Sequence, residues 1–444
     1  MAICAVYVGL AVTAALVTPW DARTQAVRTP PDELAHLIYV HELAATGELP
    51  VFTSGSGNYE AHQPPLYYLT CLPLYYLARA VAGAPETPAA FGAGFVACRL
   101  WSVLIGLGVV VAAYLGALEL FPDRPELRLG TAALVAWLPS HLINCAAVTN
   151  DGLAELWCTL TLWCLLRAAR VGLTLRAALG LGALAGLALL TKSHAAFLLP
   201  LFAVPALGVS PGPGRRTAWR GIALALVVVA AVAGWWYARN TVLYGDPLAS
   251  RAFVTIFGAD RPTPGTFLTQ AGWTIGRYLL LVALWTAYSF WGVAGQAAIF
   301  MGDGGYGVGA MLWAWALIGG ALAWARRRKE GTASATANRQ WWLIGLAAGL
   351  VGLMYVRFNA DFFQAQARYL FPAVLPLAAL HVSGWWWAAA LVGSSGKPGT
   401  RAGTAAVAIA LVAVLVMAGV CLAGLPAGAP IGPQPALLQG VLSR

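Results

Sequence analysis

The chain has 444 residues, of which 60% are hydrophobic and 10% are charged, and its mean hydropathy is +0.72. A soluble protein carries about 25% charged residues, so this composition excludes an ordinary soluble enzyme. The net charge of +10 does not indicate nucleic-acid binding, because the basic residues lie in short loops and form no patch with interleaved aromatic side chains. We therefore expect no nucleic-acid partner.

Apolar segments recur along the whole chain, and each is about long enough to cross a hydrocarbon core of ~30 Å. They predict an all-α integral membrane protein that crosses the lipid bilayer with about 11 transmembrane helices. Residues 1–424 would form a single transmembrane domain, and residues 425–444 a short outer tail. The predicted spans are 2–20, 97–120, 129–148, 152–170, 177–191, 194–209, 219–238, 306–325, 340–357, 369–390 and 402–424.

The first apolar segment has no basic region before it, so we interpret it as a retained helix and not as a cleaved signal peptide. The cysteines lie almost entirely in apolar segments, and no two are spaced as Cys-x-x-Cys. They are predicted to be small core residues that form neither a disulfide frame nor a zinc site. The seven cysteines are Cys4, Cys71, Cys98, Cys145, Cys158, Cys164 and Cys421.

The distribution of charge between the loops predicts the orientation of the chain in the membrane. The loops that these spans place inside hold 15 of the 27 Lys and Arg residues and four acidic residues. The outer side then holds 12 basic and 13 acidic residues. Because basic residues concentrate in cytoplasmic loops, the N-terminus is predicted inside and the C-terminal tail outside.

Two of the predicted outer regions are long. The first, at 21–96, contains predicted interfacial helices at 30–46 and 64–82. The second lies at 239–305, and its apolar segment 273–295 would break the charge balance if it crossed the membrane. We predict that this segment is a helix lying in the outer interface, a depth that suits its tryptophan and tyrosine residues.

The segment after the first span contains two adjacent acids and a histidine. In a helix that begins near Pro30, the side chains of Asp32, Glu33 and His36 can share one face. A capping box with Thr29 as N-cap and Asp32 at N3 is the simpler interpretation. Capping leaves Glu33 and His36 unexplained, so we predict that Asp32 and Glu33 are catalytic and that His36 contacts substrate.

His62 and Gln63 precede Pro64-Pro65, which can open a helix whose N-terminus favours anions. A simple helix start is the alternative, but we predict that both side chains contact substrate or a metal ion.

Four more charged residues fall near the predicted outer ends of later spans. Asp151 can be a helix cap, and Lys192 can extend its ammonium group to the membrane surface. Arg239 can either have a structural role or bind substrate. Arg368 is predicted to bind phosphate, because guanidinium groups bind phosphate in a bidentate way. The predicted substrate-binding residues are His36, His62, Gln63, Asp151, Lys192, Arg239, Arg368 and Tyr369.

These segments resemble, in chain order, motifs of the GT-C superfamily of membrane glycosyltransferases. The chain is similar to bacterial relatives of the protein O-mannosyltransferases and of the lipid A aminoarabinose transferases, and to predicted membrane proteins with a P-P-D-E-x-x-H signature. The matching pieces are Pro30-Pro31-Asp32-Glu33-Leu34-Ala35-His36, His62-Gln63-Pro64-Pro65-Leu66-Tyr67-Tyr68, Thr149-Asn150-Asp151, Leu190-Thr191-Lys192, Arg239-Asn240, Tyr244-Gly245-Asp246-Pro247 and Arg368-Tyr369-Leu370-Phe371-Pro372.

The resemblance implies a GT-C-like bundle and an inverting transfer of a sugar from a polyprenyl-phosphate donor to an unknown envelope acceptor, a lipid, a glycan or a protein. It places the site at the outer face of a bacterial cytoplasmic membrane, with Asp32 as general base. Many relatives have a lysine before Pro-Pro that contacts the lipid phosphate, whereas this chain has Gln63. Either another cation, such as Lys192, Arg239 or Arg368, holds the phosphate, or the substrate differs.

Two other functions stay open at this point: a transporter or flippase of a lipid-linked or anionic solute, and a non-catalytic subunit of an envelope-assembly complex. No cofactor is certain. A divalent cation held by Asp32, Glu33 and His62 is an alternative, although these ligands follow no recognised metal-binding spacing.

Overall fold

The computed structural model describes residues 1–18, 30–53, 55, 57–83, 87–207, 213–257, 261–295, 299–330, 334–392, 400–425 and 434–443. The helices are α1 (Ala2–Val17), α2 (Glu33–Thr46), α3 (Leu66–Val81), α4 (Pro88–Leu120), α5 (Pro125–Trp137), α6 (Pro139–Cys145), α7 (Asp151–Val171), α8 (Leu175–Thr191), η1 (Ser193–Phe197), α9 (Leu198–Leu201), α10 (Val204–Leu207), α11 (Pro213–Tyr244), α12 (Ser250–Phe257), η2 (Thr266–Gln270), α13 (Ile275–Gly292), α14 (Asp303–Glu330), α15 (Ala335–Asp361), η3 (Ala367–Ala373), α16 (Val374–Val392), α17 (Thr400–Gly424) and α18 (Ala436–Leu442). The strands β1 (Val293–Ala294) and β2 (Ile299–Phe300) form a short antiparallel pair.

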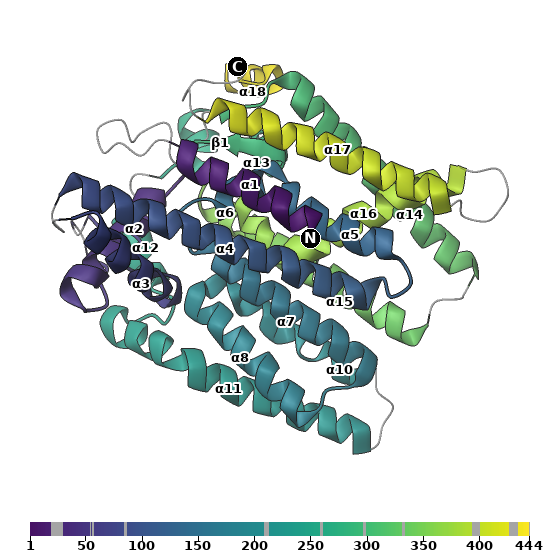
Figure 1. The fold of residues 1–444 in the computed structure, drawn as a ribbon, viewed down its shortest axis with the longest axis horizontal. Coiled ribbons are helices and arrows are strands. Elements are labelled where there is room, and N and C mark those ends of the chain that lie inside the picture. The colour runs from purple at the N-terminus through teal and green to yellow at the C-terminus, as the bar shows by residue number, and fades with distance from the viewer. Residues whose placement is uncertain are drawn as a thin grey trace.

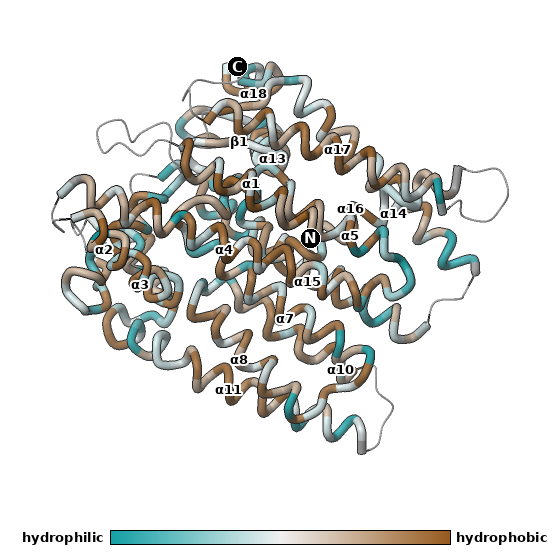
Figure 2. The backbone as a smooth tube through the Cα atoms, viewed as in Figure 1, coloured by the Kyte–Doolittle hydropathy of each residue, from teal (hydrophilic) through white to brown (hydrophobic). Residues whose placement is uncertain are grey.

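The long helices lie side by side in one bundle (Figure 1). Helices α2 and α3 lie at one end of the bundle, on the left of the view, and the adjoining ends of α4 and α5, of α10 and α11, of α14 and α15, and of α16 and α17 lie at the other. Figure 2 shows brown, apolar residues along the middle of the helices and teal, polar residues near those right-hand ends. These connecting ends and the helices of the first predicted outer region thus lie at opposite ends of the bundle. Which end faces the cytoplasm stays a prediction.

The structure confirms a multi-pass helical membrane protein. The helices α4, α7, α11, α14, α15, η3 with α16, and α17 are long and apolar enough to span, which makes seven candidates among the described residues. The predicted spans 2–20 and 177–191 correspond to the shorter apolar helices α1 and α8. The number of 11 crossings therefore remains a prediction.

Two predicted spans are wrong as continuous helices. The span 129–148 is divided at Leu138, whose backbone is extended (φ −59°, ψ 116°), because Pro139 has no N–H to continue the ladder and begins α6 instead. Within the predicted span 194–209, the residues described up to Leu207 form three short helices, η1, α9 and α10. Helix α4 begins at Pro88 and is longer than the predicted span 97–120.

The two predicted helices of the first outer region are confirmed as α2 and α3. They pack against each other, and the rings of Tyr39 and Tyr68 stack with their centroids 3.7 Å apart. Helix α13 forms within the predicted segment 273–295, and its interfacial position stays a prediction. The C-terminal helix α18 packs on α13, where Arg277 Nη2 donates a hydrogen bond of 2.7 Å to the carbonyl of Val441.

Helices α14 and α16 approach closely because both have glycine at the contact. A Cβ atom on Gly319 would lie 1.8 Å from the carbonyl oxygen of Gly384, and one on Gly384 would lie 2.1 Å from the carbonyl oxygen of Ala316. Such small-residue contacts let membrane helices pack backbone to backbone. This contact fixes α16, which continues directly from η3, the segment that carries Arg368.

Candidate functional site

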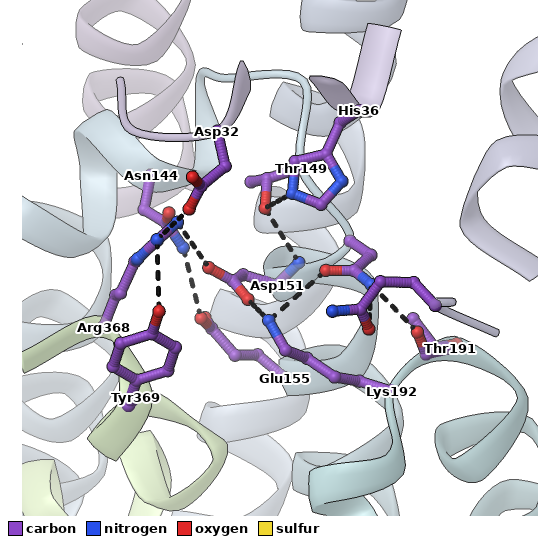
Figure 3. Close-up of polar contacts among 12 residues, drawn as sticks. Asp32, His36, Asn144, Thr149, Asp151, Glu155, Thr191, Lys192, Arg368 and Tyr369 are labelled. Carbon is purple, nitrogen blue, oxygen red and sulfur yellow. Dashed lines mark hydrogen bonds and ion pairs between the residues drawn. The ribbon is translucent and has the colours of Figure 1, made fainter. Parts of the chain in front are cut away.

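A cluster of four charged side chains lies where the starts of α2, α7 and η3 meet the end of α8 (Figure 3). We call Asp32, Asp151, Lys192 and Arg368 the charged cluster. Ion pairs connect its members in the order Asp32–Arg368–Asp151–Lys192. Two acids and two bases alternate, so the formal charges cancel.

Asp32 is the N-cap of α2 and has a left-handed backbone, with φ 67°. Aspartate is among the few residues that tolerate this conformation. Its side chain makes no capping hydrogen bond. The alternative capping-box interpretation, with Asp32 at N3, is therefore wrong, because the helix begins at Glu33. Its proposed N-cap, Thr29, lies outside the described residues.

The carboxylate of Asp32 turns toward the bundle instead of toward its own helix. Its Oδ2 pairs with Arg368 Nη2, and its Oδ1 accepts a 2.7 Å hydrogen bond from the Tyr59 hydroxyl. Burial raises the pKa of Asp32, but the positive charge of Arg368 and these hydrogen bonds outweigh burial and hold it below the usual range. Asp32 is therefore an anion near neutral pH.

Arg368 joins the two acids of the cluster. Besides Asp32, its Nη1 lies 3.7 Å from Asp151 Oδ2 and donates a 3.4 Å hydrogen bond to the carbonyl of Pro31. Its Nη2 also donates to the hydroxyl of Tyr369 at 3.4 Å. The guanidinium Nε is buried and has no hydrogen-bond partner among the described residues.

Lys192 reaches the cluster because the chain leaves α8 in an extended conformation, with φ −157° and ψ 129°. Its ammonium group pairs with Asp151 and donates a 3.4 Å hydrogen bond to Asn150 Oδ1. Asp151 lies in the first turn of α7, where the helix dipole favours a negative charge. Lys192 is thus a partly buried ion-pair partner, and snorkelling does not account for its position.

Glu33 faces different partners from Asp32. Both of its oxygens bind Arg99, at 2.8 Å from Nε and 2.7 Å from Nη2, and Oε1 also accepts from the backbone N–H of Val148 at 2.8 Å. Arg99 donates in turn to the carbonyls of Ala15 and Thr18. Glu33 therefore links α1, α2, α4 and the segment before α7, with partners separate from those of Asp32. Its catalytic role stays a prediction.

His36 lies next to the charged cluster without pairing with it. Its Nδ1 is 2.9 Å from the hydroxyl of Tyr68, and its Nε2 is 3.5 Å from Thr149 Oγ1. Burial lowers the pKa of His36, against the opposing charges of Glu60 and Asp32. The ring is therefore neutral near neutral pH and can orient a neighbour by hydrogen bonding.

His62 and Gln63 border the cluster from the loop before α3. The Nδ1 of His62 donates to the carbonyl of Tyr59 at 2.8 Å, and burial lowers its pKa to about 4. A neutral His62 cannot bind phosphate as a cation. Gln63 Oε1 accepts from Asn150 Nδ2 at 3.3 Å, which connects this loop to the start of α7.

The structure does not bring Arg239 to the charged cluster. Its Nη2 donates to the carbonyls of Leu49 and Pro50 at 3.1 and 2.9 Å, and its guanidinium lies over the ring of Trp236. These contacts tie α11 to the segment after α2. The predicted substrate contact of Arg239 gains no support from its position.

Sequence reasoning missed Glu60, Tyr59 and Arg99. Glu60 is buried, and its Oε2 has no hydrogen-bond partner among the described residues. Burial raises the pKa of Glu60, while His36 and the charged cluster interact with it electrostatically. An acidic residue in a loop leaves no periodic pattern in the sequence. Arg99, in contrast, is a lone arginine inside a predicted apolar span, and such a residue indicates a buried partner of opposite charge.

The three side chains predicted as alternative metal ligands do not lie together. Asp32, Glu33 and His62 have separate partners and form no common ligand set. Within the described ranges, the group of side chains that could hold a metal ion is His141, Cys145 and Glu155.

The fold matches those of known membrane transferases. Residues 87–235 match the family model "Dolichyl-phosphate-mannose-protein mannosyltransferase". The oligosaccharyltransferase AglB of Archaeoglobus fulgidus, solved with an inhibitory peptide and a dolichol-phosphate, is 16% identical with a TM-score of 0.57, and the match covers 98% of this chain and 56% of AglB. ArnT of Cupriavidus metallidurans is 15% identical with a TM-score of 0.51, covering 95% of this chain and 76% of ArnT.

No curated protein sequence matches the chain. The chain spans about half the length of the archaeal oligosaccharyltransferase, which is also known in complex with Zn and sulfate (TM-score 0.54, 16% identity, covering 97% of this chain and 54% of that one). The resemblance to the GT-C superfamily is thus confirmed as a likeness of fold.

Proposed function

We propose that the protein transfers a sugar from a polyprenyl-phosphate donor to an envelope acceptor, with inversion at the anomeric carbon, at the outer face of a bacterial cytoplasmic membrane. The observation that carries the proposal is the charged cluster, which puts a partly buried carboxylate, Asp32, beside two partly buried cations, Arg368 and Lys192. The cluster lies at the end of the bundle that the loop charges predict to face outside. The likeness to membrane transferases supports an enzyme over a transporter or a non-catalytic subunit.

Arg368 and Lys192 are the residues that would bind the donor phosphate. Both have carboxylates as partners, and a phosphate can take the place of a carboxylate at a guanidinium or ammonium group. This assignment accounts for Gln63, which stands where many relatives have a lysine. Tyr369, within hydrogen-bond distance of Arg368, would border the same subsite.

Asp32 would act as the general base. The acceptor hydroxyl or amine gives its proton to Asp32 while its lone pair attacks the anomeric carbon. The bond from that carbon to the phosphate oxygen breaks, and its electron pair leaves with the polyprenyl phosphate. A single displacement inverts the configuration.

The basicity of Asp32 would depend on donor binding. Paired with Arg368, the carboxylate has a low pKa and is a weak base. A phosphate that binds Arg368 draws part of that positive charge, so the proton affinity of Asp32 rises once donor is present. Positioned general bases contribute about 10²–10⁴-fold to a rate.

Replacement of Asp32 by Asn tests the proposal. Asn keeps the size of the side chain and tolerates a left-handed backbone, but it cannot take the proton. Transfer of sugar from a polyprenyl-phosphate donor should fall by about 10²–10⁴-fold. Asp361→Asn is the matched control, because Asp361 also pairs with an arginine, Arg357, but lies exposed at the end of α15. Unchanged turnover in Asp32→Asn rules out Asp32 as the base.

A further inference from the structure

A second polar cluster lies one helical turn from the charged cluster, between α6 and α7. Glu155 follows Asp151 by four residues on α7, or about 6 Å along the helix, and Figure 3 shows it near Asn144 of α6. His141 and Cys145 also lie on α6. Each of these three side chains is at most 1% exposed, and their ligand atoms all lie within 4.8 Å of one another. The proposed transfer reaction uses none of them.

The two ring nitrogens of His141 have different partners: Nδ1 faces a backbone carbonyl, and Nε2 faces Cys145 and Glu155. The carbonyl of Val135 can only accept, so His141 Nδ1 carries a proton and donates it over 2.8 Å. In a neutral imidazole the other nitrogen, Nε2, then bears a lone pair. That nitrogen lies 2.8 Å from Glu155 Oε2 and 3.5 Å from Cys145 Sγ.

The contact between His141 and Glu155 does not have the geometry of a hydrogen bond. Glu155 Oε2 is buried and has no hydrogen-bond partner among the described residues, although His141 Nε2 is 2.8 Å away. Two lone pairs at this separation repel each other unless a cation lies between them. A metal ion that lies to one side of the line between Nε2 and Oε2 can bind both atoms.

We propose that His141, Cys145 and Glu155 bind a Zn²⁺ ion. Zinc accepts nitrogen, sulfur and carboxylate ligands together, whereas Mg²⁺ and Ca²⁺ require oxygen ligands. Zn–S bonds of about 2.3 Å and Zn–N bonds of about 2.0 Å at a tetrahedral angle separate the ligand atoms by about 3.5 Å. The observed separation of Sγ and Nε2 is 3.5 Å.

Charge and surroundings favour the same ion. A thiolate, a carboxylate and a neutral imidazole cancel the two charges of Zn²⁺, and a neutral site suits an interior of low dielectric constant. Ligating histidines usually donate their second N–H to a backbone carbonyl or a carboxylate, as His141 does. Gly106 leaves room beside Cys145, since a Cβ atom there would lie 2.7 Å from Cys145 Cβ and 2.0 Å from the hydroxyl oxygen of Tyr7.

The ion would tie α6 to α7 directly beneath the charged cluster. Asn144 Nδ2, between two of the ligands in sequence, lies 3.5 Å from Glu155 Oε1, and Asp151 begins the helix that carries Glu155. The zinc site thus has a structural role, and Cys145 is more than the small core residue that the sequence predicts.

Metal content of the full-length protein, purified in detergent without chelators from zinc-supplemented cells, tests the site. We expect about one zinc per chain in the wild type and at least a tenfold loss in His141→Gln and Cys145→Ser. Cys158→Ser is the matched control, because Cys158 is a buried cysteine of α7 outside the ligand set, and it should keep its zinc. Asp32→Asn should also keep it, so the result does not depend on the transferase activity.

Cobalt substitution provides a second measurement for variants that fold poorly. Co²⁺ added to zinc-depleted wild type should give a thiolate-to-cobalt charge-transfer band, which is present in Cys158→Ser and lost in Cys145→Ser. Monodisperse wild-type protein with less than a tenth of an equivalent of zinc and without the cobalt band overturns the proposal. The His141–Glu155 contact is then an ion pair with a protonated histidine.

Discussion

Arg368 forms an ion pair with Asp32, a residue 336 positions earlier in the chain. The pair joins the start of α2 to η3, and Arg368 reaches Asp151 at the start of α7 as well. The carboxylate proposed to take the acceptor proton is therefore held by the cation proposed to hold the donor phosphate. This coupling leads to the first prediction.

Arg368→Gln should reduce sugar transfer by about 10²–10³-fold, the usual cost of removing one donor that stabilises developing negative charge. Arg368→Lys should recover part of the activity, because a lysine keeps the charge but loses the bidentate geometry. Steady-state assays with a polyprenyl-phosphate sugar measure both. Arg357→Gln is the control, since Arg357 pairs with an aspartate at an exposed position. Equal losses in Arg357→Gln and Arg368→Gln contradict the assignment.

Glu33→Gln should lower the melting temperature instead of acting on the chemical step alone. Removing one partner of a buried ion pair leaves the other charge uncompensated, at a cost of about 3–5 kcal/mol, and Arg99 is almost fully buried. The double variant Glu33→Gln/Arg99→Met should regain much of that loss. Thermal unfolding in detergent separates the outcomes. If Glu33→Gln has normal stability but no activity, the result supports the predicted catalytic role of Glu33.

Glu60→Gln should raise the melting temperature and lower turnover. A buried carboxylate oxygen without a hydrogen-bond partner costs free energy, and a neutral amide of the same size removes part of it, about 1 kcal/mol. The same change removes an acid that interacts with Asp32, His36 and Arg368. Glu48→Gln, at an exposed position of the same outer region, should change neither quantity. A Glu60→Gln protein with full turnover excludes a role in transfer.

Acid should destabilise the protein in two steps. The pKa of His62 is about 4 in the folded protein against an ordinary 6.5. Between these two pH values the histidine is protonated in the unfolded chain but not in the folded protein. The free energy of unfolding therefore falls as the pH drops through this window. The folded pKa of Asp32 lies below the ordinary 3.8, so the stability that its ion pair gives is present above pH 3.8 and is lost below it.

Melting temperatures measured against pH test these two steps. His62→Gln should reduce the slope of the curve between pH 6.5 and about 4, where His36 still contributes. Asp32→Asn should lower the melting temperature above pH 3.8, where the ion pair is formed, and should remove the further fall below that value. A wild-type curve that does not slope between those two values contradicts the burial of a neutral His62.

Gly319→Val should strongly destabilise the contact between α14 and α16, because even a Cβ atom would meet the backbone of Gly384 at 1.8 Å. Gly320→Val is the control, since a Cβ atom there meets nothing within 4 Å. Expression level and monodispersity in detergent report the difference. Similar behaviour of the two variants means that the backbones do not approach this closely.

The fold could be predicted from the sequence to the extent that it follows local patterns. Apolar runs identified most membrane helices, and the two outer helices followed from their apolar faces and prolines. The break at Leu138 could not be placed, because Pro139 is compatible both with a kinked span and with a new helix. The predicted span 194–209 is apolar, but it contains two prolines, Pro200 and Pro205, and its described part forms short helices.

The candidate site could be predicted where charged residues are isolated in apolar surroundings. Lys192 and Arg368 were found for that reason, and the structure brings them together with Asp32 and Asp151. The role of Glu33 depended on a residue 66 positions away, Arg99, which no local pattern connects to it. Glu60 was missed because burial in a loop depends on tertiary packing and leaves no periodicity in the sequence.

The alternation of charges within the charged cluster has a consequence for how ligands are exchanged. Because two acids already satisfy two bases there, the resting site presents no large net field to draw an anion from a distance. An incoming phosphate must displace a carboxylate from its cation. Occupancy should therefore follow the competition between phosphate and carboxylate for the same cations and depend only weakly on bulk salt.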